Sequence, residues 1–166
     1  MTEPTLRVAR VADLPTLIEL LFDDDLGRQR EAAAGGADRP VPADYRDAFE
    51  AIAADPRNEL VVAEHDGAVV AMMQLTYIPS LSRLGAERMQ IEAVRVRSDL
   101  RGAGLGQQMI EWALERGRQR GCRLAQLTTD KARVDAHRFY LRLGFTATHE
   151  GMKLVLAPAP SADATS

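Results

Sequence analysis

Val96-Arg-Ser-Asp-Leu-Arg101-Gly-Ala-Gly104-Leu-Gly106 lies between two stretches of regular pattern. Residues 88–97 alternate well enough to predict a strand, and residues 105–120 carry apolar side chains at helical spacing. Small residues between a strand and a helix let the backbone approach a ligand closely, and free N–H groups at a helix start attract an anion. The loop therefore predicts a phosphate cradle. The alternative is a tight turn that only packs strand against helix.

Two common phosphate motifs do not match this loop. A Walker A loop requires Lys and then Ser or Thr after its last glycine, whereas Gln107 and Gln108 follow Gly106. A Rossmann fingerprint follows the first strand of a βαβ unit and has an acidic residue about 20 positions later. Here the loop follows the fourth predicted strand, and residues 120–126 contain no acid. An ATPase and a dinucleotide-binding domain are both disfavoured.

Composition indicates an ordinary soluble protein. The 166 residues are 46% hydrophobic and 27% charged, and 21 Lys and Arg face 24 Asp and Glu, for a formal charge of −3. This balance argues against nucleic acid or an anionic membrane as a partner. No segment has the roughly 20 apolar residues of a membrane span, and no secretory signal is evident. With the single cysteine Cys122, we expect a cytoplasmic protein without disulfides, and the three scattered histidines predict no metal site.

Periodicity and turn residues predict the order of the elements. In the first half we expect a strand at 6–11, a capped helix with Pro15 in its first turn, a mobile loop over 23–43, a helix from 42 or 43 to about 54, and a hairpin of strands 60–64 and 68–77. A polar loop at 79–87, the strand and helix above, a strand at 122–128, a helix at 133–143 and one or two strands over 145–156 should follow. The fold class is α/β (α+β), with a mixed, mostly antiparallel sheet of six to seven strands flanked by about four helices. Residues 1–156 would form one domain and residues 157–166 a disordered tail.

Two motifs resemble those of the GNAT superfamily of N-acetyltransferases. The run from Val96 to Gly106 is similar to the family's acetyl-CoA motif, Arg or Gln, two residues, Gly, one residue, and Gly or Ala. Ala136-His-Arg-Phe-Tyr140-Leu-Arg-Leu-Gly144-Phe145 is similar to its second motif. The resemblance covers roughly residues 5–156, its first half by element order alone. It implies that acetyl-CoA, as co-substrate, lies in a V-shaped split between the fourth strand and the fifth.

The resemblance also implies which residues bind the co-substrate. Backbone groups near Val94 and Val96 would pair with the pantetheine arm, and the N–H groups of the glycine-rich loop would hold the diphosphate, with Arg101 beside it. Arg133 stands where many members have Asn and could reach a phosphate. The full implied set is Val94, Val96, Arg101, Gly102, Ala103, Gly104, Leu105, Gly106, Gln107, Arg133, Ala136 and Tyr140.

Acetyl transfer to an amine requires a neutral nucleophile, so a base must take a proton. Glu92 is the candidate, on the same alternating face as Val94 and Val96 if no bulge intervenes. The alternative is a carboxylate that orients substrate or pairs with Arg88 or Arg95. His149 is a second candidate base.

The departing thiolate needs a proton donor, and the family's usual donor corresponds to Tyr140. A phenol with a pKa near 10 is roughly matched to a thiol near 8.5. The alternative for Tyr140 is an aromatic filling the core beside Phe139. The backbone N–H of Val94 would meet the oxyanion.

The resemblance, with these candidate residues, implies an N-acetyltransferase that moves an acetyl group from acetyl-CoA to a primary amine of a small molecule, by direct transfer in a ternary complex. Three consecutive aspartates, Asp23 to Asp25, could attract a cationic amine, although a solvated helix end is the simpler reading. The alternatives are acetylation of a protein lysine or N-terminus, and a non-catalytic CoA-binding module. A homodimer is expected because many relatives pair.

Overall fold

The computed structural model describes residues 3–23, 27–28, 43–154 and 156. Contacts divide the chain into two compact units, Met1–Gln126 and Leu127–Ser166. Most of the expected loop and the whole expected tail at 157–166 lie outside the described residues. The single domain over 1–156 stays a prediction. In the described ranges, no helix combines the length and apolar character needed to cross a membrane.

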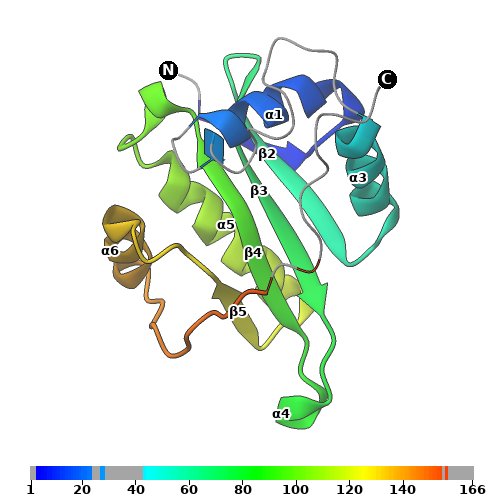
Figure 1. Cartoon of the computed structure of the whole chain (residues 1–166), viewed down its shortest axis with the longest axis vertical. Coiled ribbons are helices and arrows are strands. Elements are labelled where there is room, and N and C mark those ends of the chain that lie inside the picture. Colours follow the sequence, from blue (N-terminus) through cyan, green and yellow to red (C-terminus); the bar gives the residue numbers. More distant parts are fainter. Residues whose placement is uncertain (1–2, 24–26, 29–42, 155, 157–166) are drawn as a thin grey trace. The chain divides into compact units, whose positions relative to one another are not determined.

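The first unit is a sheet with helices on both faces (Figure 1). Its strands lie in the order β1-β2-β3-β4-β5, antiparallel from β1 to β4, with β5 parallel to β4. In chain order the elements are β1 (Thr5–Val8), η1 (Val11–Asp13), α1 (Leu14–Phe22), α3 (Ala43–Ala54), β2 (Asn58–His65), β3 (Ala68–Ile78), α4 (Ser82–Gly85), β4 (Arg88–Val96), η3 (Ser98–Leu100), α5 (Leu105–Arg120) and β5 (Leu124–Leu127).

Local signals account for most of these boundaries. Asp66 and Gly67 have φ of 49° and 77°, as the hairpin turn between β2 and β3 requires. Helix α5 ends at Gly121, whose φ of 87° and N–H bond to the carbonyl of Arg118 form a glycine C-cap. Helix α3 ends just before Asp55-Pro56, because a residue preceding proline resists the helical region. The fold class, the order of these elements and the split beside β4 are confirmed.

The expected number of strands was wrong. The sheet has five strands among the described residues, not six to seven, because the chain after Gly144 forms no strand there. Its β-prone residues lack a ladder partner, and Met152 and Leu154 are 93% and 84% exposed. The polar loop at 79–87 contains the short turn α4, in which Arg83 and Leu84 adopt left-handed angles.

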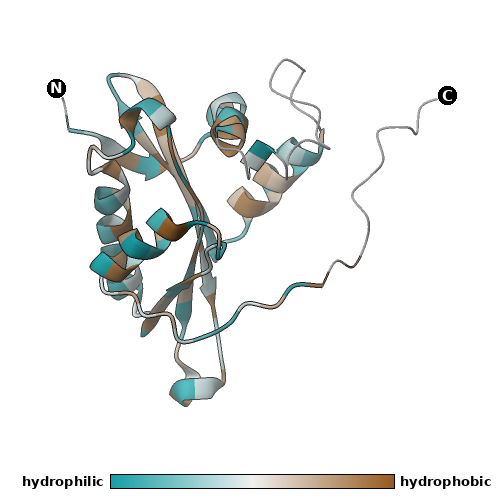
Figure 2. Ribbon diagram, turned by 60° about the vertical axis from the view of Figure 1, so that its left-hand side comes forward, coloured by the Kyte–Doolittle hydropathy of each residue, from teal (hydrophilic) through white to brown (hydrophobic). Residues whose placement is uncertain are grey.

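The two faces of the sheet bury different sets of side chains. Helices α1 and α3 cover one face, where Leu17 and Phe49 join Leu60, Val62 and Met72 in one apolar cluster. Helix α5 packs on the opposite face, which carries the alternate residues of the strands, such as Met89 and Ile91. Hydrophobic residues accordingly concentrate along the strands in Figure 2. This two-sided burial holds β4 and the start of α5 in place.

The second unit contains α6 (Val134–Arg142). An Asx turn precedes it, with the Asp130 carboxylate accepting from the Ala132 N–H at 2.9 Å. The helix ends before Gly144, whose φ is 89°. On α6 the Tyr140 ring makes edge contacts with Phe139 and Phe145, at centroid distances of 5.1 and 5.8 Å.

Candidate active site

A β-bulge interrupts β4 next to the proposed base. Gln74 is opposite Glu92 and Met72 is opposite Arg95, so the single residue Met73 faces two residues of β4. The extra residue, Ala93, has a φ of 50°, a conformation that costs a non-glycine residue energy and is common beside functional sites. The bulge breaks the alternation, so the condition under which Glu92 would share a face with Val94 and Val96 is not met.

Glu92 presents a free carboxylate. It is exposed, and by register its side chain lies on the face of Gln74, the same face that α1 and α3 partly cover. Within the described part of the chain it has no hydrogen-bond or ion-pair partner, so the alternative pairing with Arg88 or Arg95 is not formed. A carboxylate that accepts no hydrogen bond within the protein and lies on an exposed face can take a proton from a bound ammonium group.

Arg101 holds the loop between β4 and α5. Its Nε donates to the Val96 carbonyl at 3.0 Å, and its Nη2 donates to the carbonyl and carboxylate of Asp23 at 2.9 and 3.0 Å. The Ser98 N–H also donates to the Asp23 carboxylate, at 2.7 Å. Asp23 therefore anchors the loop, and its carboxylate is not simply solvated at the end of a helix. Asp24 and Asp25 lie outside the described residues.

The glycine-rich loop forms a cradle of backbone donors. Gly102 and Gly104 have φ of 82° and 87°, and a Cβ built on either would meet nothing within 4 Å. The first helical bond of α5 runs from the Gln108 N–H to the Gly104 carbonyl at 3.1 Å. The N–H groups of Leu105, Gly106 and Gln107 precede it and have no backbone acceptor in the described ranges.

This cradle fits the diphosphate of a coenzyme A thioester. The free N–H groups lie at the positive end of the helix dipole, and the positions where Gly102 and Gly104 would carry a Cβ are open among the described residues. The first residue of the helix, Leu105, is buried in the core and so holds the start of α5 in place. Among the implied binding amides, that of Ala103 is already engaged, since it donates to the Leu100 carbonyl at 3.4 Å.

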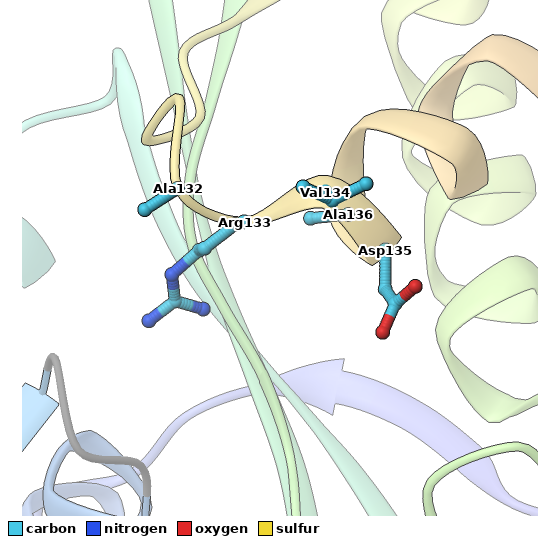
Figure 3. Close-up of a pocket in the computed structure, with 5 residues that line it drawn as sticks. All are labelled: Ala132, Arg133, Val134, Asp135 and Ala136. Carbon is cyan, nitrogen blue, oxygen red and sulfur yellow. The ribbon is translucent and has the colours of Figure 1, made fainter.

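In the second unit, the implied residues Arg133 and Ala136 line one hollow. It has a volume of about 330 Å³ and is formed by Ala132, Arg133, Val134, Asp135 and Ala136 at the start of α6. Figure 3 shows the Arg133 guanidinium and the Asp135 carboxylate pointing in different directions from this turn. His149 is exposed, and its Nδ1 lies 2.7 Å from the Thr148 hydroxyl.

Sequence reasoning missed a set of polar side chains around Glu92. They occupy the part of the α1/α3 face that the helices leave partly exposed, and we call them the polar platform: Asn58, Gln74, Thr76, Arg88, Gln90, Glu92 and Gln126. Two hydrogen-bonded groups compose most of it, one centred on Asn58 and one joining Gln90 to Gln126 at 2.6 Å. The detectable signal is Gln74 and Thr76 interrupting the apolar run of β3.

The split sheet, the cradle at the start of α5 and the free carboxylate on β4 define an acyltransferase of the GNAT type. The chain belongs to the acetyltransferase (GNAT) family, whose model matches residues 19–145. It is 36% identical over 108 residues to an aminoalkylphosphonate N-acetyltransferase from Salmonella typhimurium, an alignment that spans 63% of this chain and 68% of that protein. These findings support enzymatic acyl transfer over the non-catalytic alternative.

Solved structures share the fold of this chain. A transcriptional regulator from Bacillus halodurans superposes with a TM-score of 0.88 at 46% identity, covering 93% of this chain and all of that one. An acetyltransferase from Trypanosoma brucei superposes with a TM-score of 0.73 at 27% identity, covering 93% of this chain and all of that one.

Proposed function

We propose that the protein transfers the acetyl group of acetyl-CoA to the primary amine of a small molecule, directly, in a ternary complex. This proposal rests on one observation. Backbone N–H groups without acceptors lie at the start of α5, and β4, the strand before it in the sequence, carries the unpaired carboxylate of Glu92, as judged from the described residues. A relative that acts on aminoalkylphosphonates supports a small-molecule acceptor.

The residues that would hold acetyl-CoA follow from the free donors. The N–H groups of Leu105, Gly106 and Gln107 would bind the diphosphate, and the open glycines allow close approach. The carbonyls of Val94 and Val96 already accept one guanidinium N–H each, from Arg95 and Arg101, which leaves each oxygen a second lone pair. When bound, acetyl-CoA supplies the acyl group and a thiol leaving group.

Two side chains would move protons. Glu92 takes one proton from the bound ammonium, so that its nitrogen gains a lone pair and attacks the thioester carbon. As the N–C bond forms and the C–S bond breaks, the nitrogen loses a second proton, which passes to water. Tyr140 gives its phenolic proton to the sulfur, and the backbone N–H of Val94 would donate to the oxyanion. The free state of Glu92 supports its role, and the edge contacts of Tyr140 with two phenylalanine rings would orient its ring.

Direct transfer is favoured over an acyl-enzyme on the chain's single cysteine. The Cys122 thiol is partly buried and lies 3.6 Å from the Glu87 carboxylate. Burial raises the pKa of this thiol, and the neighbouring carboxylate raises it further. Little thiolate is then present at neutral pH to attack a thioester.

A panel of amines assayed for CoA-thiol release tests the proposal. We expect turnover with short primary amines and none with lysine peptides or free protein N-termini. Acetylation of peptides in preference to every small amine would show that the acceptor is a protein. A Cys122→Ser variant should keep its activity, whereas loss of activity with accumulation of acetyl-protein in the wild type would refute direct transfer.

We also propose that the protein acts in the cytoplasm as a homodimer, as its family resemblance and lone free cysteine suggest. Sedimentation velocity at micromolar concentration gives the mass of the particle. A monomer under assay conditions would remove the dimer from the proposal.

A further inference from the structure

The polar platform around Glu92 has donors and acceptors whose orientations follow from one carboxylate. Asp55 accepts the Arg57 N–H at one oxygen and the Asn58 Nδ2 at the other, both at 2.8 Å. The Arg57 N–H, with Asn58, holds the pKa of Asp55 below its usual value, so this group stays ionised and can only accept. The amide nitrogen of Asn58 must therefore face Asp55.

This choice fixes the next side chains along the sheet. With its nitrogen on Asp55, Asn58 offers its Oδ1 to the Thr76 hydroxyl at 2.8 Å and to the Gln74 Nε2 at 3.2 Å. Gln74 must then donate to Asn58, and its Oε1 is left as an unspent acceptor. Gln74 is the direct cross-strand neighbour of Glu92, and such neighbours have Cβ atoms about 5 Å apart. Two acceptors, Gln74 and Glu92, therefore sit side by side.

The other end of the platform presents donors. Gln90 accepts the Gln126 Nε2 at 2.6 Å, so its own amide N–H groups are unspent in the described part of the molecule. Arg88 lies two residues further along the same face of β4, opposite Ile78. It is partly buried, and no hydrogen bond or ion pair engages its guanidinium among the described residues. Along β4 the face thus changes from a cation through a donor to a carboxylate.

We propose that the polar platform binds the acceptor and selects a short primary amine that also carries an anionic group, a carboxylate or phosphate-type group. The ammonium donates to Glu92 and Gln74, and the anion accepts from Gln90 and Arg88. The Cα atoms of Glu92 and Arg88 are four residues, or about 13 Å, apart along the strand, a span that two long side chains and a short molecule fill. This inference rests on the proposed function, to which it adds the class of acceptor and the residues that recognise it.

Matched amines test the inference. The rate of thiol release is measured with 3-aminopropionate and O-phosphoethanolamine, and with propylamine and ethanolamine, which lack the anion. We expect kcat/KM at least tenfold higher for the anionic members, and Arg88→Gln should lower that preference about tenfold, as loss of a charged hydrogen bond predicts. Arg118→Gln is the matched control, because Arg118 is exposed on α5 and its side chain pairs with Glu115 alone among the described residues. Equal rates for both classes, or an unchanged preference in Arg88→Gln, would overturn the inference.

The role of Asn58 in orienting Gln74 is tested by comparing the KM for the amine with the KM for acetyl-CoA. Asn58→Leu frees the Gln74 amide to rotate, so we expect KM for the amine to rise several-fold while KM for acetyl-CoA stays constant. An equal rise in KM for the amine and KM for acetyl-CoA would indicate a general loss of structure. It would contradict the proposal that Asn58 orients Gln74. If no amine releases thiol, the proposed function has failed. Calorimetry then compares O-phosphoethanolamine binding to wild type and Arg88→Gln, and equal affinities would refute the platform itself.

Discussion

Replacing Gly104 by alanine separates the conformational demand of the cradle from its role in binding. Gly104 caps α5 with φ 87° and ψ −9°, and an added Cβ meets nothing within 4 Å. The cost in folding free energy is therefore backbone strain alone, about 1–2 kcal/mol for a non-glycine residue in the left-handed region. For a protein of this size that lowers Tm by about 2–8 °C, measurable by calorimetry.

Binding should suffer separately. The methyl group that Gly104→Ala adds would enter the open space beside the glycine-rich loop and hinder the close approach of an anion to the backbone N–H groups there. Loss of one hydrogen bond to a charged group costs about 1.5–3 kcal/mol, so Kd for acetyl-CoA should rise tenfold or more in isothermal titration.

Two further variants make this prediction falsifiable. Gly151→Ala is the matched control, because that position has no positive φ and nothing within 4 Å, and its Tm should stay within a degree or two of wild type. Gly104→Asn should recover much of the lost stability, since asparagine tolerates the left-handed region, but not the lost affinity. Two results would refute the prediction. One is a Tm for Gly104→Ala equal to that of Gly151→Ala, and the other is a lowered Tm with an unchanged Kd for acetyl-CoA.

Three other outcomes are expected. Glu92→Gln should lower kcat at neutral pH about a hundredfold in the thiol-release assay, with exposed Glu115→Gln as control, and full activity would move the base elsewhere, to His149 for example. Tyr140→Phe should lower kcat and change its alkaline pH profile; an unchanged profile would rule out the acid role. Burial raises the pKa of Tyr77 to about 12, so the folded protein keeps a proton that the unfolded chain releases above pH 10. The free energy of unfolding should fall as pH rises from 10 to 12, and Tyr77→Phe should remove that share of the slope in alkaline urea titrations.

Much of the fold could be predicted from the chain because its signals are local. Asp66-Gly67 demanded a turn with positive φ, and Pro56 and Gly121 ended their helices, whatever surrounded them. The strand, glycine-rich loop and helix that make the cradle were equally local. The strands expected after Gly144 failed because a strand depends on a partner ladder as well as on its own β-prone residues.

The candidate site divides in the same way. Local sequence predicted the loop of backbone donors and the single acid, Glu92, in the fourth strand, because both depend on neighbours in the chain. The roles given to them came with the family resemblance and stay predictions. The bulge at Ala93, the engagement of Asp23 by Arg101 and the row from Asp55 through Asn58 to Gln74 exist only in the folded molecule. Each joins residues on different elements, and their register depends on how the whole sheet is packed, which no single stretch of sequence encodes.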